Sequence, residues 1–350
     1  MNKINSQAFF LHKKGTSEEA FELRDFQINT PVNQEVLIEV ESFGLNYADV
    51  MARRGLYKEA PAFPCVVGYE VVGKIIQLGT EADQSLVGKR VMAFCRFGGY
   101  SKHVITNDFA TVVVSDQPAS ELLALCTQAV TAYYMAIYLT PVHKGDKVLI
   151  HAAAGGVGSL LIQMAKSRGA IVIAKVGRKE KEEFVRNLGA DYVVNYNDEE
   201  YKAKTLELLK GERIDVSFNP VAGSTYKKDF ELMGSGGRLI LFGASEISSG
   251  KWGIFSKLNF VRKMGLILPV GLMMRSKNVL GVNMLKIADN RPNVLTFCLS
   301  ESFKMYKDEI IKPQVGGAYE KDEFHKAHNA LESGKTTGKL SCKSSCCGKV

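Results

Sequence analysis

The sequence predicts an α/β protein in which a doubly wound parallel sheet is inserted into a discontinuous, mostly β domain. Three observations lead to this fold class. Residues 32–125 alternate apolar and polar side chains, with glycines at the turns. Residues 126–281 alternate helix-like and strand-like segments. After residue 290 the chain again shows the sequence pattern of the first segment. Strand and helix repeating in this way are typical of a doubly wound parallel sheet.

Composition limits the classes of protein to consider. The 350 residues are 46% hydrophobic and 23% charged, which suits a two-domain globular chain. The net charge of +8 does not indicate a nucleic-acid partner, because the densest basic cluster, "GRKEKEEFVR", is interleaved with acids as on a solvated helix face. We find neither an apolar run suited to a signal peptide nor one of about 18 residues suited to a membrane span, and therefore expect a cytoplasmic protein.

Short strands and hairpins are expected in the first domain. The segments "VLIEVESFGLN", "VVGYEVVGKIIQLG" and "VGKRVMAF" have the two-residue period of half-buried strands. They predict a small antiparallel domain over about residues 1–125.

Helices and strands alternate from Cys126 onward. The helix "ALCTQAVTAYYMAIYLT" is followed by the strand at 148–152, a helix ending at Arg168 and the strand "AIVIAKV". Next come the helix "KEKEEFVRNLG", the strand "DYVVNY", the helix "EEYKAKTLELLKG" and the strand "IDVSFNP". A helix-like segment and the strand "GRLILFGA" complete the series. Segment 245–277 departs from this rhythm before "NVLGVNML" supplies one more strand.

The predicted domain boundaries follow from these changes in the sequence pattern. The outer domain comprises residues 1–127 and 282–341, with a helix "PNVLTFCLSESFKMYKDE" and a strand-like "IKPQVGGAYE" in its second part. The inserted domain comprises residues 128–281. Residues 342–350, with Cys342, Cys346 and Cys347, are expected to form a disordered tail, although palmitoylation or metal capture would suit the same residues.

A glycine-rich turn opens the inserted domain. The stretch "LIHAAAGGVGSLLIQMAKSRGA" reads as strand, turn and helix, with Gly155 and Gly158 in the second and third glycine positions of a dinucleotide fingerprint and Ala153 in the first. The second glycine lets the backbone approach a pyrophosphate, and the third lets the helix pack on the strand. Free N–H groups at the helix start would face the phosphates. We therefore predict a Rossmann-type dinucleotide site, with a purely structural turn as the alternative.

The end of the next strand indicates which dinucleotide is bound. Enzymes that select NAD usually carry an acid there, whereas this strand ends "AKVGRKEK", with Gly177 at that position and Arg178, Lys179 and Lys181 beyond it. Cations without a carboxylate favour the 2′-phosphate of NADPH. The alternative is an ordinary helix start with exposed cations.

Several motifs together resemble one family over about residues 5–341. They are "FGLNYADVMARRGLY", "FPCVVGYEVVGKIIQLG", "VGKRVMAF", "HAAAGGVG", "LGADYVVNY" and "GKTTGKL". The chain resembles the medium-chain dehydrogenase/reductase superfamily, within it the zinc-independent quinone oxidoreductases, and among these the vesicle amine transport protein 1 (VAT-1) like branch. The resemblance implies that the outer domain is GroES-like.

The same resemblance implies that no zinc is bound. Zinc enzymes of the superfamily place a cysteine ligand where this chain has Asn46 and a histidine where it has Tyr69. A catalytic zinc needs three strong protein ligands and an open position, which Glu70 cannot supply alone. The four-cysteine structural lobe is also missing, because only Cys95 falls in that region.

The resemblance further implies a set of cofactor contacts. These are Gly155, Gly156 and Val157 at the pyrophosphate; Gly177, Lys181 and Tyr196 around the 2′-phosphate, joined by Arg178 through proximity; Asn46 and Thr131 on the nicotinamide side; Phe242 and Gly243 closing over it; and Lys339 reaching the cofactor from the C-terminal segment. Asn219 and Ala222 replace residues usual in relatives, and segment 245–277 is longer and more apolar than in small quinone reductases.

The expected chemistry is hydride transfer from NADPH to a quinone or an α,β-unsaturated carbonyl. Without a metal to polarise an isolated carbonyl, an acceptor that delocalises negative charge is the better substrate. Asn46 and Tyr57 are the candidate catalytic residues that would bind the acceptor oxygen, with Tyr47 and Tyr69 behind them; packing beneath the entry loop is the other role open to Tyr57. The alternative function is an NADPH-binding protein of the VAT-1 type with weak turnover that acts in lipid or membrane association.

Partners are expected from the edge of the parallel sheet. The apolar strand "NVLGVNML" would end that sheet, and an uncovered edge of this kind usually pairs with its symmetry mate, which predicts a homodimer. The apolar segment 254–274 could contact lipid, substrate or a second subunit.

Overall fold

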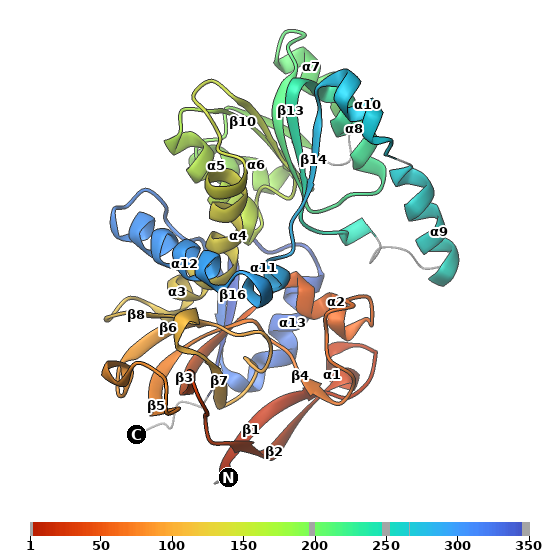
Figure 1. Cartoon of the computed structure of the whole chain (residues 1–350). Coiled ribbons are helices and arrows are strands. Elements are labelled where there is room, and N and C mark those ends of the chain that lie inside the picture. Colours follow the sequence, from red (N-terminus) through yellow and green to blue (C-terminus); the bar gives the residue numbers. More distant parts are fainter. Residues whose placement is uncertain (1–2, 196–199, 247–252, 266, 345–350) are drawn as a thin grey trace. The chain divides into compact units, whose positions relative to one another are not determined.

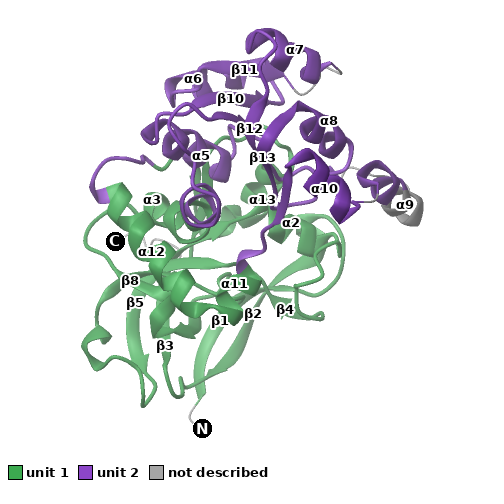
Figure 2. Ribbon diagram, turned by 45° about the horizontal axis from the view of Figure 1, so that its top comes forward, with its two compact units in different colours: residues 1–130, 285–306, 313–350 green, residues 131–284, 307–312 purple. Residues whose placement is uncertain are grey.

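The computed structural model describes residues 3–195, 200–246, 253–265 and 267–344, without the side chains of residues 253–258. The chain divides into two compact units, coloured separately in Figure 2. Unit 1 contains residues 1–130, 285–306 and 313–350, and unit 2 contains residues 131–284 and 307–312. The predicted fold class, a parallel-sheet domain inserted into a discontinuous β domain, is confirmed.

Unit 2 is built on a six-stranded parallel sheet (Figure 1). In spatial order its strands are β11 (Tyr192–Asn195), β10 (Ile171–Val176), β9 (Lys147–Ile150), β12 (Ile214–Asn219), β13 (Met233–Leu241) and β14 (Asn278–Gly281). Strand β9 therefore lies between β10 and β12, where the strand order reverses. In such sheets ligands bind outside the carboxyl ends of the strands at this reversal.

Helices follow the strands of unit 2 in turn. They are α5 (Gly156–Ser167), α6 (Glu182–Asn187) after the short η5 (Lys179–Lys181), α7 (Tyr201–Leu208) and α8 (Ser224–Leu232). Helix α5 packs on β9 and β10 and buries the expected face of Leu160, Leu161 and Met164. Helix α8 packs on β12 and β13. Each helix thus covers the strands next to it in sequence, as the 3.6-residue period requires.

Unit 1 contains two sheets. The larger has the order β15 (Val315–Tyr319), β16 (Lys339–Lys343), β3 (Glu35–Leu45), β5 (Glu70–Leu78), β6 (Arg90–Phe94) and β8 (Thr111–Val113), with β7 (His103–Asn107) paired to β3. The smaller has the order β2 (Phe21–Asn29), β1 (Lys3–Leu11) and β4 (Cys65–Val66). Only β15 and β16 pair in parallel; every other described pairing in unit 1 is antiparallel.

Short helices complete unit 1. They are α1 (Ser17–Ala20), α2 (Tyr47–Arg53), η1 (Gln84–Leu86), η2 (Asp108–Ala110), α3 (Ala119–Ala124), η3 (Leu125–Ala129), α12 (Pro292–Lys307, whose last residue falls in unit 2), η7 (Lys321–Glu323) and α13 (Phe324–Glu332). Helix α11 (Met284–Asn290) begins at the last residue of unit 2's main segment. The expected strand "NVLGVNML" is therefore shorter than predicted, because Met284 already starts this helix.

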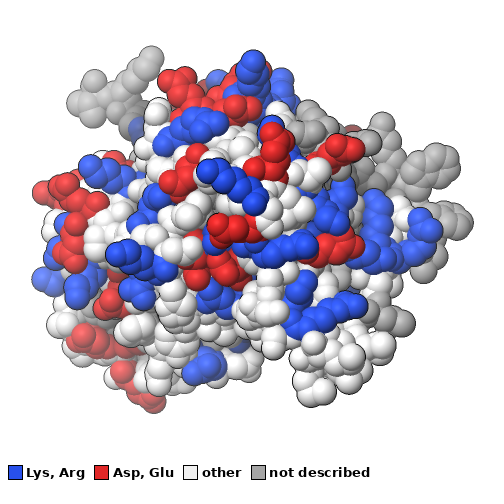
Figure 3. Space-filling model, turned by 90° about the horizontal axis from the view of Figure 1, so that it is seen from above, with Lys and Arg blue, Asp and Glu red and all other residues white. Residues whose placement is uncertain are grey.

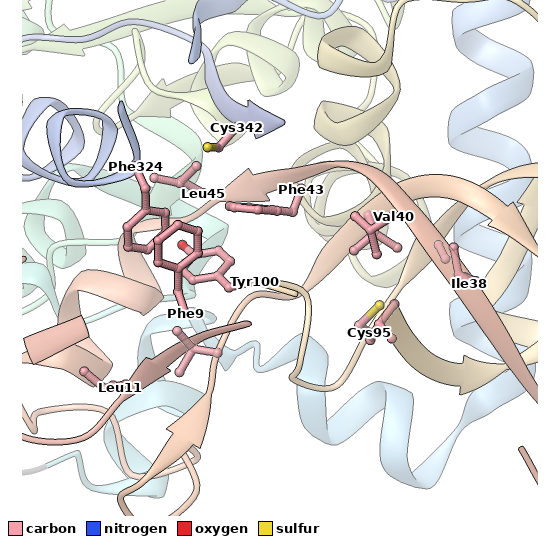
Figure 4. Packing of buried hydrophobic residues seen from close by; sticks show 14 of the residues in the cluster. Phe9, Leu11, Ile38, Val40, Phe43, Leu45, Cys95, Tyr100, Phe324 and Cys342 are labelled. Atoms are coloured by element: carbon pink, nitrogen blue, oxygen red, sulfur yellow. The ribbon is translucent and has the colours of Figure 1, made fainter. Parts of the chain in front are cut away.

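An aromatic cluster forms the centre of the unit 1 core (Figure 4). Phe9 stacks on Phe324 with ring centroids 3.9 Å apart, and Phe324 meets Tyr100 edge-on at 5.3 Å. Cys342 is buried in the same cluster. The predicted disordered tail is therefore wrong at its first two residues, because Cys342 and Lys343 belong to β16; Cys346 and Cys347 lie outside the described residues.

A continuous helical rod joins the first β segment to unit 2. It runs from Ala119 to Leu139 through α3, η3, α4 (Val130–Tyr133) and η4 (Tyr134–Leu139), and η3 and η4 are π-helical. By length and composition this helix could cross a membrane, although no membrane span was predicted from the sequence. However, 72% of its most apolar 18-residue window is buried inside the protein. A core helix of a folded domain has these properties.

Two helices occupy the segment that departs from the α/β rhythm. They are α9 (Gly253–Met264) and α10 (Pro269–Arg275). None of the residues of α10 is buried, and the exposed fractions of Leu268, Met273 and Met274 are 67%, 74% and 80%. This face is the most exposed apolar surface among the described residues.

Candidate functional site

The glycine-rich loop lies between β9 and α5, at the reversal of strand order. Gly158 is buried, and a Cβ built on it would lie 2.7 Å from Ala153 Cα and overlap Ala152 O. The helix can therefore approach the strand this closely only with glycine at this position, which is the role of the third glycine in a dinucleotide turn. The predicted strand, turn and helix are all present.

Backbone donors are available at the start of α5. The first helical hydrogen bond joins Ser159 N–H to Gly155 O at 2.9 Å, so the N–H groups of Gly156 and Val157 precede the helical ladder. Gly155, Gly156 and Val157 are all partly exposed. Donors of this kind at a helix N-terminus are suited to binding phosphate oxygens.

The missing first glycine has a structural consequence at a neighbouring residue. Ala152, not Ala153, adopts a positive φ of 50°. Ala153 is completely buried, and its N–H bonds Lys175 O at 3.1 Å. The turn thus places the left-handed residue one position earlier than the fingerprint register suggests, at a modest cost for alanine.

The end of β10 carries the residues predicted to surround a 2′-phosphate. Gly177 and Arg178 are exposed, and Lys181 is half-buried in η5. Burial and then the charge of Arg178 lower the pKa of Lys181. The two cations are thus close enough to repel one another, and an anion between them would relieve that repulsion. Tyr196 lies outside the described residues.

The carboxyl ends of β12 and β13 meet beside the loop's strand. Phe242 N–H bonds Asn219 O at 3.3 Å, and a Cβ on Gly243 would lie 2.7 Å from Pro220 O. The predicted Phe242 and Gly243 therefore sit at the same edge of the sheet as the glycine-rich loop. The loop, the end of β10 and the end of β13 all lie at the carboxyl edge of the unit 2 sheet, whereas Thr131 is buried in α4.

Asn219 shows why the departures from the family pattern are tolerated. Its Oδ1 accepts the N–H groups of Val221 and Ala222, both at 2.9 Å, and its Nδ2 donates to Asp229 Oδ2 at 2.7 Å. An aspartate at this position would set two carboxylates against each other in a buried place. Ala222 takes a positive φ of 58° in the turn that Asn219 holds.

A buried polar cluster lies behind the loop and was not predicted. Asp229 accepts Tyr201 OH at 2.7 Å and Ser217 Oγ at 2.8 Å, and His151 Nε2 lies 2.8 Å from its Oδ2. Although burial raises the pKa of Asp229, the charge of His151 and these hydrogen bonds give a net lowering. The cluster ties the residue after β9 to helix α8.

Lys175 extends this cluster at the end of β10. It is 1% exposed, and its ammonium lies 3.1 Å from the centroid of the Tyr201 ring. Burial lowers the pKa of Lys175 to about 7, against the opposing charge of Asp229. A buried lysine in this position titrates near neutral pH.

Asn46 is the centre of the predicted acceptor site in unit 1. It caps α2 at the end of β3, with its N–H donating to Asp49 Oδ2 at 2.8 Å. Its side-chain amide donates from Nδ2 to Glu70 Oε1 at 2.7 Å and accepts from Lys339 Nζ at 3.1 Å. Asn46 is partly exposed, whereas Glu70 and Lys339 are completely buried.

Lys339, predicted as a cofactor contact, bonds three oxygens of unit 1. Its ammonium donates to Leu45 O at 3.2 Å, to Asn46 Oδ1 and, in a very short contact, to Glu70 Oε1. All three donors of the ammonium are therefore used by protein oxygens. The importance of Glu70 as its partner was missed; an acid and a lysine in separate motifs give no sequence signal that they pair.

Tyr57 and Tyr69 lie side by side in unit 1. Their ring centroids are 6.3 Å apart in an edge-on contact. Burial raises the pKa of Tyr57 to about 12, and burial also raises the pKa of Tyr69 well above its ordinary value. Both phenols thus stay protonated at neutral pH. Tyr47, 37% exposed, begins α2 next to Asn46.

Asp49 links Asn46 to the core of unit 1. Its carboxylate accepts Tyr100 OH at 2.8 Å and Gly68 N–H at 3.2 Å. Because it is completely buried, its pKa is raised to about 7 in spite of these bonds. No group of three or more histidine, cysteine, aspartate or glutamate residues suited to a metal ion occurs in the part of the chain that the structure describes.

Comparisons with known proteins identify the family of the chain. Residues 32–116 match the family described as the alcohol dehydrogenase GroES-like domain, and residues 156–300 match the family described as zinc-binding dehydrogenase. Together the two matches cover roughly two thirds of the chain. The chain belongs to the medium-chain dehydrogenase/reductase superfamily. Within it, the chain is similar to quinone oxidoreductases and to VAT-1 homologues.

Individual relatives share about a quarter of their residues with this member of the superfamily. A quinone oxidoreductase of Pseudomonas aeruginosa is 28% identical over 322 residues, which cover 91% of this chain and 94% of the relative. A synaptic vesicle membrane protein VAT-1 homolog of Danio rerio is 25% identical over 308 residues, which cover 87% of this chain and 63% of that longer protein. The structure of Escherichia coli quinone oxidoreductase complexed with NADPH superposes with a TM-score of 0.84 at 25% identity, covering 96% of this chain and 99% of that one.

Proposed function

We propose that this protein is an NADPH-dependent oxidoreductase that reduces a quinone or an α,β-unsaturated carbonyl without zinc. Similarity to quinone oxidoreductases, one of them complexed with NADPH, supports the broad class of oxidoreductase with this cofactor. The observation that carries the proposal is the loop after β9, where Gly158 packs against the backbone of Ala152 and Ala153 at the reversal of strand order.

The residues of unit 2 fit NADPH. The partly exposed N–H groups of Gly156 and Val157 suit the pyrophosphate, and Arg178 and Lys181 suit the 2′-phosphate. Phe242 and Gly243 flank the same edge of the sheet. NADPH, when bound, supplies a hydride for transfer to the acceptor.

The residues of unit 1 suit an acceptor that gains negative charge on oxygen. The Asn46 amide is oriented by Glu70 and Lys339, and among the described residues only one hydrogen bond from its nitrogen is made. Its second N–H is therefore available to an acceptor oxygen. Tyr57 holds its phenolic proton at neutral pH and serves as a second donor, and solvent supplies the proton that completes the reduction.

The donor set at the superfamily's zinc position does not fit a zinc ion. Asn46 and Tyr69 offer an amide and a phenol, and the Glu70 carboxylate is already bonded to the Lys339 ammonium. A divalent cation there would meet a buried positive charge and weak ligands. The chain is therefore expected to bind no zinc although it matches the family described as zinc-binding dehydrogenase, and metal analysis of the purified protein tests this.

The reductase proposal is tested by NADPH oxidation with a naphthoquinone, phenanthrenequinone and a linear enone. Turnover of one of them is the expected result, with Asn46→Ala lowering kcat by about 100-fold, as loss of one oxyanion donor does. Stoichiometric zinc, or no turnover by a protein that binds NADPH, would count against the proposal.

A second candidate function is supported by the exposed face of α10. Leu268, Met273 and Met274 are at least two thirds exposed. Between Glu246 and Asp289 the chain has no acid but carries Lys251, Lys257, Arg262, Lys263, Arg275, Lys277 and Lys286. Exposed apolar residues among cations suit an anionic lipid surface. We propose this weak-turnover, lipid-associating role as the alternative.

Vesicle sedimentation distinguishes the two functions. Vesicles containing phosphatidylserine should retain the protein, neutral phosphatidylcholine vesicles should not, and the variant Met273→Ser/Met274→Ser should weaken retention at least tenfold. The matched control is Ile76→Ser, because Ile76 is also exposed but lies in β5 of unit 1. Equal behaviour on both kinds of vesicle would remove this candidate.

The remaining proposals concern assembly and location. Strand β14 forms one edge of the unit 2 sheet, and its residues are exposed or half-buried. We propose that this edge pairs with its counterpart in a homodimer in the cytoplasm, with no nucleic-acid partner. Acidic side chains are interspersed with the basic ones on the face shown in Figure 3, which supports the last point. A monomeric mass in solution would contradict the homodimer.

A further inference from the structure

We propose that Lys339 and Glu70 are positioning residues that hold the Asn46 amide in the single orientation in which it donates to the acceptor. The inference deepens the proposed reductase function and rests on it. It assigns to Lys339 a role in the acceptor site of unit 1 instead of one at the cofactor.

The three side chains form a closed triangle of hydrogen bonds. Asn46 Nδ2 donates to Glu70 Oε1 at 2.7 Å, Lys339 Nζ donates to Asn46 Oδ1 at 3.1 Å, and Lys339 also contacts Glu70 Oε1. They come from three distant parts of the chain, the end of β3, the start of β5 and the start of β16. The antiparallel register that sets Leu340 opposite Leu45 brings Lys339 next to Asn46.

The triangle permits only one orientation of the amide. An ammonium has no acceptor and a carboxylate has no donor. Rotating the Asn46 amide by half a turn would set its NH2 against Lys339 and its oxygen against Glu70, two repulsive contacts beside completely buried charges. The second N–H of the amide consequently keeps one direction. A donor with one direction costs no reorganisation when charge develops on the acceptor.

Two neighbouring residues accommodate the ion pair of Lys339 and Glu70. Thr127 Oγ1 donates to the second oxygen of Glu70, and Gly44 leaves room where a Cβ would overlap that carboxylate. A buried ion pair usually contributes little more to stability than an apolar pair of the same size. Stability alone therefore does not account for the Glu70–Lys339 pair, whereas orienting the Asn46 amide gives the pair a function.

The test uses the double variant Lys339→Met/Glu70→Gln in the full chain. Changing both residues avoids an uncompensated buried charge, which by itself would destabilise the protein strongly. We expect kcat with the best quinone or enone to fall about tenfold or more, because a small misplacement of a group that contacts the substrate lowers the rate by such a factor. The Kd of NADPH should change by less than about twofold, since its predicted phosphate ligands belong to unit 2.

A thermodynamic cycle with Asn46→Ala separates positioning from a merely structural role. If Lys339 and Glu70 act through the amide, the double change should lower kcat/KM no further in the Asn46→Ala background. A structural role would lower it by the same factor in both backgrounds. Lys343→Met is the matched control, because Lys343 lies on the same strand and its ion pair with Glu320 is at the surface.

Each outcome has one meaning. Retention of kcat by the double variant, or additive losses in the cycle, overturns the positioning role while the reductase function stands. No turnover by the wild-type chain overturns the reductase function and the positioning role with it. If the double variant does not fold, Thr127→Val and Thr127→Ser decide: loss of kcat in the first with recovery in the second supports the role, and equal activity of the two contradicts it.

Discussion

The ammonium of Lys339 contacts the carboxylate of Glu70, and neither side chain is exposed to solvent. The same carboxylate oxygen accepts the Asn46 amide at 2.7 Å. A buried charge of either sign is costly without its partner, so the two residues depend on each other for stability. Removing Lys339 or Glu70 alone should therefore lower the free energy of unfolding by about 3–5 kcal/mol.

Gly44 should be intolerant of even one added methyl group. A Cβ at this position would overlap Glu70 Oε1 and lie 2.5 Å from Lys339 Cε. We expect Gly44→Ala to lower the thermal midpoint, at a cost of about 1–3 kcal/mol as for other overpacked cores, and to lower kcat. Calorimetry and NADPH oxidation measure the two effects. Unchanged activity at a lowered midpoint would mean that the amide tolerates displacement of its partners.

Gly158→Ala should weaken NADPH binding. The added Cβ would lie 2.7 Å from Ala153 Cα, so α5 must move away from the loop that presents its N–H groups. An affinity loss of about tenfold, measured by fluorescence titration, is the expected result. Gly271→Ala is the control, because nothing lies within 4 Å of a Cβ there and alanine favours its helix. Equal affinities of the two variants would argue against a cofactor site at this loop.

Arg178 and Lys181 should determine the choice between NADPH and NADH. Arg178→Ala and Lys181→Ala are each expected to raise the Kd of NADPH about tenfold and to leave that of NADH unchanged, because only NADPH carries a 2′-phosphate. Arg186→Ala, an exposed cation on α6, serves as control. Since burial and Arg178 lower the pKa of Lys181, the preference for NADPH should also decline as pH rises toward that pKa. A preference for NADPH that is unchanged in both variants would contradict this assignment.

Lys175 should make stability depend on pH. Burial lowers its pKa to about 7 from an ordinary value of 10.5, so between these values the unfolded chain binds more protons than the folded one. The contribution of Lys175 to stability therefore becomes more favourable as pH rises from about 7 to 10, with a slope of at most about 1.4 kcal/mol per pH unit. Denaturant unfolding of wild type and Lys175→Met should show their difference changing in this direction; parallel curves would refute it.

Local patterns were sufficient to predict the strands and helices around the glycine-rich loop of unit 2. The glycine-rich turn, the apolar face of Leu160, Leu161 and Met164, and Gly177 at the end of β10 all depend on residues close in sequence. The period and spacing of these residues therefore predict their secondary structure directly. Strands β1 and β2 were not identified individually; β2 has only one buried residue, and five of its nine residues are exposed, so burial gives little support to it.

Long-range contacts were beyond the reach of the sequence. Glu70 and Lys339 are separated by 269 positions, and nothing near either residue signals that they pair. Burial of Cys342 against the aromatic core likewise depends on the pairing of β16 with β3. The acceptor site was therefore predicted at Asn46, whose motif is local, but not at the pair that orients it.

NADPH consumption with the quinone and enone panel, alongside fluorescence titration with NADPH and NADH, is the decisive experiment for the reductase function. NADPH is expected to bind at least about tenfold tighter than NADH and to be consumed with at least one acceptor, as charge-assisted contacts to one phosphate allow. Equal binding of the two cofactors, or NADPH binding with none of the acceptors reduced, would contradict this expectation.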